Sequence, residues 1–400
     1  MAVQSSSNRE VKLIPITSDL IVVGAGPAGS MAAYHAASMG LDVTVIEKRT
    51  FPHAKPCAGG LSAKTLALLP FSISSVVENT TNRITIGLGL GEKVTVAAGG
   101  LICCFVVREK FDRLLVEHAQ KAGAKFRKIE TLDKVEIDRA EVRLTLDSQE
   151  IVTAKYVIAA DGANSQVRRM ISPKGKFSRG FAIEGTVPRS KVQNVPDMEL
   201  SFGCLEHGYA WIFPKRNHVN IGLYTCQEGA LLSKKKLCEY ALAKLGTAEV
   251  KEMVGFPLGY GGRTYKQTDE RVLFAGDAAG MVEPLLGEGL HNAIKSGAFA
   301  GVAVANALKS GRSAKDAYNE ALRPIRRDLW RSEQLSKLFY GNLEKGGFQV
   351  LKLPVVRTGL IRGFAAGKTM HKITNSFAMM RWQKPIYPVL EGNPKQPSEG

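Results

Sequence analysis

A glycine-rich turn near the start of the chain constrains the fold more than any other feature. The apolar stretch at residues 19–23 runs into Gly24-Ala25-Gly26-Pro27-Ala28-Gly29, a GxGxxG turn; helix-forming residues follow, and a second apolar stretch at residues 43–46 ends at Glu47. In a strand–helix–strand unit, such glycines permit a tight turn, close approach to a pyrophosphate and close helix–strand packing, and the acidic residue hydrogen-bonds a ribose. We therefore expect a dinucleotide at the helix N-terminus, where free N–H groups attract phosphate. The turn alone does not distinguish FAD from NAD.

The net charge bears on the partners of the protein. The 400 residues carry a formal charge of +17, and residues 311–384 contribute fifteen Lys and Arg against five Asp and Glu. A charge of this size indicates an anionic partner, such as a membrane surface or a phosphorylated substrate. Aromatic and basic residues do not alternate along a strand pair, so nucleic acid is not an expected partner.

The cysteines and the apolar stretches bear on the compartment. The six cysteines form no CxxC pair, and neither they nor the histidines show metal-ligand spacing, so we expect a reduced protein without a metal site. Residues 1–17 lack the apolar core of a signal peptide, and no stretch approaches the ~18 apolar residues of a membrane span. The expected location is cytoplasmic, either free or peripheral at the cytoplasmic face of the membrane.

The order of strand and helix patterns predicts an α/β protein with more than one domain. Alternating segments at 83–86 and 93–96 indicate antiparallel strands, residues 181–224 are β-rich, an Ala-rich helix covers about 289–308, and the tail beyond Ser313 is helical with breaks at Pro324, Pro354 and Pro385. We expect a Rossmann-like dinucleotide-binding domain from residues 18–70, 101–177 and 267–310. An inserted antiparallel-sheet substrate domain takes residues 71–100 and 178–266, between an N-terminal tail (1–17) and basic C-terminal helices (311–400).

Two further motifs indicate which dinucleotide is bound. An apolar strand ends in Asp161-Gly162, and another, at residues 272–275, ends in Gly276-Asp277. Both resemble the flavoprotein group that includes the aromatic hydroxylases. By that resemblance the cofactor is FAD, and the Asp277 carboxylate binds its ribityl chain. Taken singly, each is also a common strand-ending turn.

The segment after Asp277 narrows the resemblance to one family. Residues 283–297 contain Pro284-Leu285-Leu286-Gly287-Glu288-Gly289 followed by a helix with Ala-Ile-x-Ser-Gly, which resembles the geranylgeranyl reductase family. Glycines here let backbone N–H groups approach the flavin ring, and the helix dipole favours negative charge on it. The alternative is a capped packing helix.

Three other segments extend the resemblance. Residues 55–61 resemble the family's Cys-Gly-rich loop beside the flavin, with Ala58 where many members carry Gly. Residues 108–112 resemble the Arg-x-x-Phe-Asp helix start, whose Arg contacts FAD. Residues 206–214 match the PxxYxWxFP segment that lines the lipid-side cavity, except that Glu206 replaces the first proline. By alternation alone, these aromatic residues could equally form the face of a core strand.

The candidate site follows from these motifs. The expected FAD-binding residues are Gly24, Gly26, Ala28, Gly29, Glu47, Lys48, Cys57, Ala58, Gly60, Arg108, Asp161, Asp277, Gly287, Gly289 and Leu290, and the expected substrate-binding residues are Tyr209, Trp211 and Phe213. Cys57 is also the candidate catalytic residue, as a proton donor or by shaping the pocket; alternatively it is a small packing residue.

The resemblance implies an FAD-dependent reductase that saturates carbon–carbon double bonds in a prenyl chain. Its partners would be a prenylated lipid or prenyl diphosphate and an external electron donor, NAD(P)H or ferredoxin. A flavin monooxygenase or halogenase of the same fold remains an alternative, as does a non-catalytic flavoprotein at a membrane. A helix over residues 355–380 mixes apolar and basic residues. It could lie on an anionic membrane or pack over the substrate tunnel with a solvated basic outer face, and these two arrangements are compatible.

Overall fold

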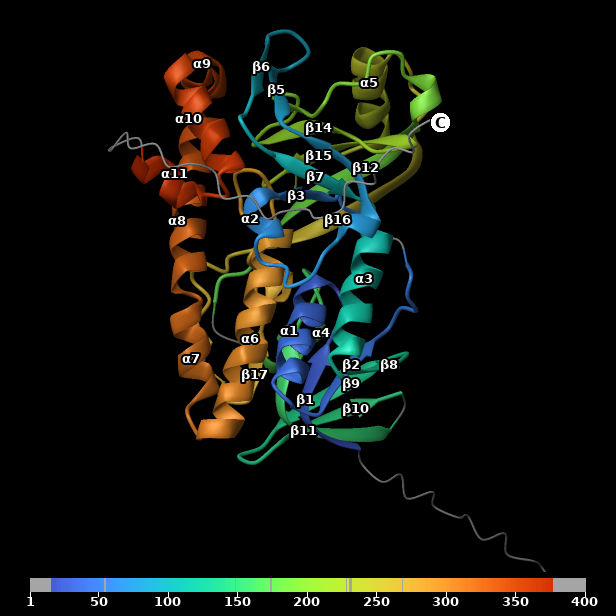
Figure 1. Ribbon diagram of the computed structural model, residues 1–400, viewed down its shortest axis with the longest axis vertical. Coiled ribbons are helices and arrows are strands. Elements are labelled where there is room, and N and C mark those ends of the chain that lie inside the picture. Colours follow the sequence, from blue (N-terminus) through green and yellow to red (C-terminus); the bar gives the residue numbers. More distant parts are fainter. Residues whose placement is uncertain are drawn as a thin grey trace, which may run out of the picture.

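The computed structural model describes residues 16–376, apart from 54, 148, 173–174, 228, 230–231 and 268. Two seven-stranded sheets lie at opposite ends of the molecule, a three-stranded sheet lies between them, and a column of C-terminal helices runs along one side (Figure 1). The fold is therefore α/β with a Rossmann-like part and an antiparallel part, which confirms the predicted class. The expected N-terminal tail of residues 1–17 lies almost wholly outside the described residues.

The first sheet carries the dinucleotide motif. Its strand order is β8-β2-β1-β11-β10-β9, with β17 beside β11, and β1, β2, β8, β11 and β17 are mutually parallel. The strands are β1 (Ile16–Val23), β2 (Val43–Glu47), β8 (Lys125–Lys128), β9 (Leu132–Ile137), β10 (Val142–Leu146), β11 (Glu150–Ala159) and β17 (Val272–Phe274). Because β1, β11 and β17 are parallel neighbours, the turns that follow them meet at one edge of the sheet.

Helix α1 (Pro27–Ser38) packs against α6 (Leu290–Ser310) and α3 (Arg108–Lys121) beside this sheet. Two glycines set the distance between α1 and α6. A Cβ atom on Gly297 would lie 2.0 Å from the carbonyl oxygen of Ala28, and one on Gly301 would lie 2.3 Å from that of Ala32. The two backbones therefore touch directly, which fixes the middle of α6 against the first turns of α1.

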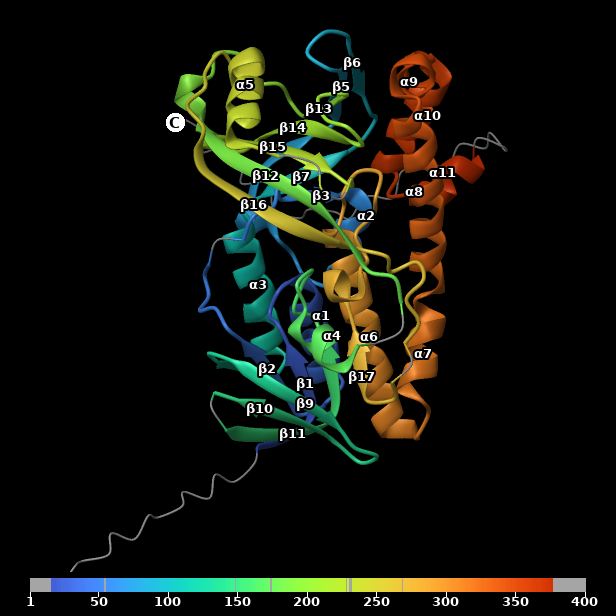
Figure 2. The ribbon, with the colours of Figure 1, turned by 180° about the vertical axis from the view of Figure 1, so that it is seen from behind.

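The second sheet has the order β16-β12-β15-β14-β13-β5-β6 and is antiparallel except for the pair β13–β5. Its strands are β5 (Arg83–Leu88), β6 (Lys93–Ala97), β12 (Ser178–Pro188), β13 (Glu199–Phe202), β14 (Gly208–Pro214), β15 (His218–Thr225) and β16 (Lys251–Tyr260). Helix α5 (Lys234–Leu245) lies on the side away from the first sheet in both views (Figure 2). Apolar side chains of the other face belong to a separate core cluster, shared with the C-terminal helices.

The small sheet joins the two halves. It consists of β3 (Gly60–Ser62), β7 (Cys103–Val106) and β4 (Val77–Thr81). The short helix α2 (Ala63–Leu66) follows β3, and the 3₁₀ turn η1 (Ser74–Val76) precedes β4. Strands of the first large sheet fall within the ranges expected for the dinucleotide domain, apart from the first two residues of β1, and those of the second fall within the ranges expected for the substrate domain. The small sheet draws on both, so we keep the domain division as a proposal.

The C-terminal helices are α7 (Ala314–Ala321), α8 (Arg323–Gly341), the π-helical turn η4 (Leu343–Gly347), α9 (Phe348–Lys352), α10 (Pro354–Ala365) and α11 (Met370–Ser376). Pro324 and Pro354 lie in the first turns of α8 and α10. They begin new helices, as proline can where the N–H has no intrahelical partner, so the predicted breaks in the helical tail at Pro324 and Pro354 are confirmed. Pro385 lies outside the described residues.

The single helix expected over residues 355–380 is wrong. Helix α10 ends at Ala365, Gly367 follows with φ +68°, and α11 begins at Met370. A glycine in the left-handed region ends a helix by redirecting the chain. Residues 377–380 lie outside the described part. None of the described helices is both long enough and apolar enough to cross a membrane.

Candidate active site

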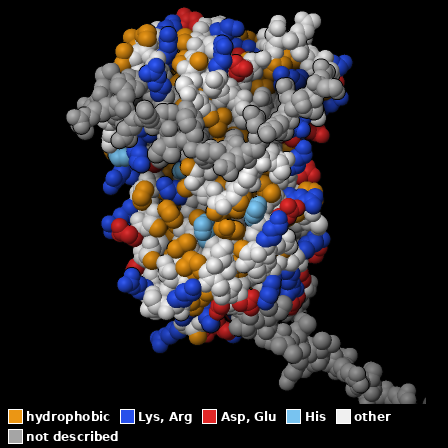
Figure 3. Space-filling view, viewed as in Figure 1, with side chains coloured by type: hydrophobic (Ala, Val, Ile, Leu, Met, Phe, Trp, Pro, Cys, Tyr) orange, Lys and Arg blue, Asp and Glu red, His pale blue; other side chains and the backbone are white. Residues whose placement is uncertain are grey.

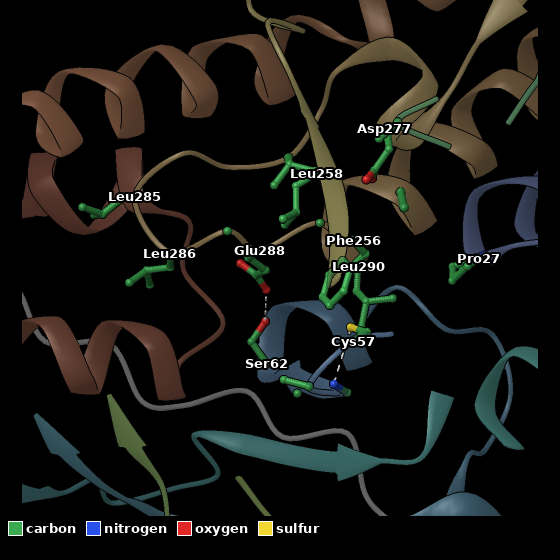
Figure 4. A pocket seen from close by; sticks show the side chains of 18 of the residues that line it. Pro27, Cys57, Ser62, Phe256, Leu258, Asp277, Leu285, Leu286, Glu288 and Leu290 are labelled. Carbon is green, nitrogen blue, oxygen red and sulfur yellow. Dashed lines mark hydrogen bonds between the residues drawn. The ribbon is translucent and has the colours of Figure 1, made fainter. Parts of the chain in front are cut away.

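A large cavity lies between the two main sheets and extends to the C-terminal helices. Its volume is about 1150 Å³. Ligand pockets are commonly about 300–1,000 Å³, so this one has room for a dinucleotide and a second molecule. Figure 4 shows its central part: Pro27 and Asp277 lie to one side, Leu285 and Leu286 lie to the other, and Cys57 and Glu288 lie between them.

The GxGxxG turn forms one end of the cavity. Gly24 has φ +98°, and a Cβ atom there would lie 2.6 Å from the carbonyl oxygen of Ala160; one on Gly29 would lie 1.8 Å from that of Gly24. Both therefore serve the tight turn and the close helix–strand packing, and Gly24 and Gly26 also line the cavity. Because no described side chain caps the N-terminus of α1, its N–H groups remain available to a phosphate.

Glu47 lies at the end of β2 and lines the cavity, as does Lys48. One carboxylate oxygen of Glu47 accepts the backbone N–H of Ala25 at 2.8 Å, and the other accepts that of Arg49 at 3.0 Å. Each oxygen retains a second lone pair for a ribose hydroxyl. The carboxylate is thus fixed against the glycine turn in the position expected from the spacing.

The turns after β11 and β17 bring two carboxylates to the cavity. Asp161 accepts the backbone N–H of Gln166 at 2.7 Å through Oδ2, whereas its buried Oδ1 has no partner among the described groups. Burial raises the pKa of both Asp161 and Asp277. Buried polar atoms are normally hydrogen-bonded, so the unpaired oxygen indicates a donor that a ligand would supply. The polar groups of a dinucleotide fit this need.

Arg168 connects these two turns and was not among the predicted site residues. Its guanidinium donates to the carbonyl oxygen of Ala163 at 2.6 Å and to that of Ala278 at 2.5 Å. Arg168 follows Asp161 by seven residues, but nothing in the sequence indicates that its side chain connects two segments more than a hundred residues apart.

The loop before α6 faces the cavity and is held from several sides. Glu283, buried at 5% exposure, accepts the backbone N–H groups of Leu285 and Leu286 at 2.7 and 2.9 Å. Burial raises the pKa of Glu283 to about 7. Gly287, Gly289 and Leu290 line the cavity, and no described side chain caps the N-terminus of α6. A second uncapped helix end thus points toward the dinucleotide site.

Glu288 lines the cavity and forms a shielded ion pair that the sequence did not reveal. Its carboxylate contacts the Lys64 ammonium at 2.5 Å and accepts the Ser62 hydroxyl at 2.7 Å. Burial alone would lower the pKa of Lys64 and raise that of Glu288, but the opposite charge outweighs burial at both groups. The pair therefore remains ionised, and a negative carboxylate lies beside the two cavity glycines.

The Cys57 loop forms the wall between the two ends of the cavity. Cys57, Ala58 and Gly60 line the cavity, and the Cys57 backbone N–H donates to Glu184 at 2.8 Å. Arg108, only 6% exposed, forms a bidentate pair with Asp112, with both distances at 2.7 Å. Burial alone would lower the pKa of Arg108. The Asp112 carboxylate and, to a smaller extent, the nearby Cys57 side chain raise it instead.

The other end of the cavity is apolar. Tyr209 and Phe213 line it, together with Val356, Leu360, Ile361 and Phe364 of α10 and its surroundings. Trp211, Ala28 and Gly29 are not among the described residues that line the cavity, although the sequence analysis assigned all three to the site. Residues 356–364 cover the apolar end, which agrees with the predicted packing of this segment over a tunnel, whereas its contact with a membrane stays a prediction.

The described residues contain no group of three or more His, Cys, Asp or Glu side chains that could hold a metal ion. The arrangement instead combines three converging turns, two uncapped helix ends and two inward carboxylates, which together suit FAD. This is the site of an FAD-dependent oxidoreductase.

Comparison with known proteins identifies the family. Residues 17–188 match the FAD binding domain family. The chain is 36% identical to an uncharacterised protein of Methanosarcina barkeri, with 81% of this chain and 84% of the relative covered. It is 31% identical to the digeranylgeranylglycerophospholipid reductase of Methanosarcina acetivorans (78% and 80% covered) and 30% identical to the menaquinone reductase of Mycobacterium tuberculosis (71% and 76% covered). The chain belongs to the geranylgeranyl reductase family.

Solved structures share the fold. A geranylgeranyl bacteriochlorophyll reductase-like protein of Thermoplasma acidophilum superposes with a TM-score of 0.74 at 23% identity, covering 91% of this chain and 99% of that one. A halogenase in complex with FAD superposes with a TM-score of 0.71 at 15% identity, covering 90% and 83%. At these identities the likeness concerns the fold alone.

Proposed function

We propose that the protein reduces carbon–carbon double bonds in the geranylgeranyl or other prenyl chain of a lipid, using FAD. The observation that carries this proposal is the continuity of one cavity, which joins the three dinucleotide turns to a long apolar arm under α10. Relatives named for a digeranylgeranyl phospholipid and for menaquinone support a prenyl chain as substrate. Both are amphipathic, and either would place its chain in the apolar arm.

The residues that would hold FAD lie along the polar half of the cavity. The two uncapped helix ends would take the phosphates and the flavin, Glu47 a ribose, and Asp277 the ribityl chain. When bound and reduced, FAD supplies a hydride equivalent to the alkene. The remaining cofactor-binding candidates lie around these groups: Gly24, Gly26, Lys48, Cys57, Ala58, Gly60, Arg108, Asp161, Gly287, Gly289 and Leu290.

The protein's own contribution is to position the alkene, exclude water and supply a proton. An isolated alkene is a poor acceptor, so the reacting carbon must be held within about 3–3.5 Å of its donor in a dry site. Tyr209, Phe213 and the α10 side chains supply apolar walls for this purpose. Cys57 lies where the two halves meet, and we assign to its thiol the proton for the second alkene carbon; solvent would then reprotonate the thiolate.

The surface near the apolar arm supports a peripheral membrane contact. Leu338, Val350, Leu353 and Val355 are 73%, 48%, 54% and 62% exposed, and Leu338 and Val350 also line the cavity. Figure 3 shows hydrophobic side chains gathered at the upper left, over α9. We call these four residues the apolar rim. With the basic charge of the C-terminal region, the apolar rim suits an anionic bilayer from which a lipid chain could enter.

The test of the function is product mass. Purified, chemically reduced enzyme is mixed with geranylgeranyl lipids under anaerobic conditions, and the products are analysed by mass spectrometry. We expect a gain of two hydrogens per reduced bond. Unchanged lipid would contradict the proposal. Substrate-stimulated oxygen uptake with a hydroxylated or halogenated product would instead establish an oxygenase or halogenase. Parallel assays with NADPH and with reduced ferredoxin would identify the donor.

A further inference from the structure

Trp211 occupies an unexpected position for a residue of the aromatic segment. It lies on the same face of β14 as Tyr209 and Phe213, two residues from each, yet it does not line the cavity and is 4% exposed. Its ring lies over Gly222, where a Cβ atom would be 2.1 Å from the ring, and its Nε1–H donates to Oδ1 of Asn220 at 2.7 Å. A side chain held on both sides in this way has a structural task inside the sheet.

That task leads toward Cys57. Burial raises the pKa of Glu184, and Asn220, whose Oδ1 already accepts from the indole, partly counteracts this shift. The buried Oε2 of Glu184 has no hydrogen-bond partner among the described groups. Glu184 is 7% exposed and lies on β12, next to β15. Its Oε1 accepts the backbone N–H of Cys57 at 2.8 Å, a bond between residues 127 positions apart. The second sheet therefore reaches across to the Cys57 loop through one buried carboxylate.

Lys215 supplies the nearby positive charge. It is 3% exposed, and a Cβ atom on Gly59 would lie 3.3 Å from its ammonium nitrogen. Burial lowers the pKa of Lys215 and raises that of Glu184, and each group counteracts the shift of the other. Lys215 directly follows the Tyr-x-Trp-x-Phe-Pro segment, so the same strand end provides Trp211 and this lysine.

We propose that Glu184 is a positioning residue for Cys57: with Asn220 oriented by Trp211 and with Lys215 as its countercharge, it fixes the backbone of the Cys57 loop against the cavity. This deepens the proposed function, because it explains how a thiol on a loop could keep one place beside the reacting chain. It also gives Trp211 a role other than substrate contact. The hydrogen bond itself does not depend on which substrate is reduced.

The experiment measures the Cys57 loop directly in the FAD-loaded full-length protein. Iodoacetamide alkylation of Cys57 is followed by peptide mass spectrometry, and hydrogen exchange is followed in the peptide that contains its backbone amide. Glu184→Ala should raise the alkylation rate about tenfold and remove protection of this amide, since one buried hydrogen bond to a charged group is lost. Glu184→Gln should raise it less, because its carbonyl oxygen still accepts the N–H.

Two matched controls separate positioning from general loosening of the sheet. Glu199 is also a buried glutamate of the second sheet, but its ion partner is Lys244, so Glu199→Gln should leave Cys57 within twofold of wild type. Trp211→Phe should raise the alkylation rate of Cys57, as Glu184→Ala does. Tyr240→Phe, which loses a hydrogen bond to Ser201, should not raise it.

Wild-type alkylation and exchange rates in Glu184→Ala, with FAD absorbance retained, would overturn the proposal; so would equal loosening in Glu199→Gln. If Glu184→Ala does not fold, Glu184→Gln and Trp211→Phe decide the question by the same readouts. A wild-type enzyme that reduces no prenyl lipid would refute the proposed function while leaving these rates interpretable. Where reduction is observed, Glu184→Ala should lower kcat about tenfold with little change in KM.

Discussion

The hydroxyl of Tyr209 donates a hydrogen bond of 2.5 Å to the carbonyl oxygen of Leu286. Tyr340 of α8 donates to the carbonyl of Leu285 at 2.7 Å, and Tyr224 of β15 donates to that of Pro284 at 2.9 Å. Three successive carbonyls of the loop before α6 are thus held by three different elements. This loop lines the cavity, so the second sheet and the C-terminal helices together determine the shape of the cavity there.

Removal of the Tyr209 hydroxyl tests this arrangement. Tyr209→Phe should lower the free energy of unfolding by about 0.5–1.5 kcal/mol and weaken FAD binding several-fold, because the Leu286 carbonyl loses its donor. Denaturant unfolding and flavin fluorescence titration measure the two effects. Tyr318→Phe is the control, since the Tyr318 hydroxyl donates to the carbonyl oxygen of Phe274, which is not part of the loop before α6. Equal FAD affinities in the two variants would show that the loop does not need this bond.

Asp277 should matter more than any single glycine for cofactor retention. Asp277→Ala removes a half-buried carboxylate that lines the cavity, and hydrogen bonds to charged groups contribute about 1.5–3 kcal/mol, so FAD affinity should fall roughly 10- to 150-fold. The absorbance at ~450 nm after gel filtration gives a first reading, and calorimetric titration gives the constant. Asp138→Ala, on an exposed turn, should bind as wild type. Undiminished affinity in Asp277→Ala would remove Asp277 from the site.

Much of this site could be predicted because its determinants are local. A GxGxxG turn, an acidic residue at a strand end and a Gly-Asp turn each state their geometry in a few adjacent residues, and the structure brings Gly26, Glu47 and Asp277 into one cavity. Gly29 permits the close packing of the helix on the strand that the motif predicts, without lining the cavity.

What could not be predicted depends on contacts between distant segments. Trp211 lies on the same face of β14 as Tyr209 and Phe213, as the alternation predicts, and packs in the same apolar cluster. Its ring lies over Gly222 and donates to Asn220 of the next strand, so it does not line the cavity. Arg168 bonds Ala278, 110 residues away, and Glu184 bonds Cys57, 127 residues away. No spacing in the sequence predicts hydrogen bonds of this kind. In the tail, the breaks at Pro324 and Pro354 were predicted correctly, whereas the end of α10 before Gly367 was not.

The raised pKa of Glu283 predicts a pH-dependent contribution to stability. The folded chain binds a proton with a pKa of about 7, above the ordinary value of 4.5. The favourable contribution is complete below pH 4.5, shrinks as the unfolded chain ionises, and is lost as the pH rises through 7, by at most roughly 3 kcal/mol. Glu283→Gln cannot ionise, so its melting temperature relative to wild type should be higher at pH 8 than at pH 5. A difference that does not change with pH would contradict this assignment.

The apolar arm should be sensitive to added volume. Leu360→Trp places a larger side chain on the cavity face of α10, and overpacking commonly costs about 1–3 kcal/mol, so kcat/KM for a geranylgeranyl lipid should fall roughly 5- to 150-fold. FAD affinity should not change, because the dinucleotide turns lie at the other end. Thr358→Trp lies on the same helix outside the lining and serves as control. Unaltered turnover of long-chain lipid by Leu360→Trp would mean that the chain lies elsewhere.

The apolar rim should carry membrane binding if lipid enters from a bilayer. Val355 is 62% exposed and Leu338 is 73% exposed, and burying a side chain of this size in an apolar phase yields about 1.5–3 kcal/mol. The double variant Leu338→Asp and Val355→Asp should therefore lose flotation with anionic phosphatidylglycerol vesicles while retaining FAD. Leu242→Asp provides the matched control, because this leucine is 56% exposed on α5, on the opposite side of the second sheet from the cavity. Flotation that survives the double variant, or that is lost equally in Leu242→Asp, would mean that the apolar rim does not bind the membrane. Lipid entry at this site would then have no support.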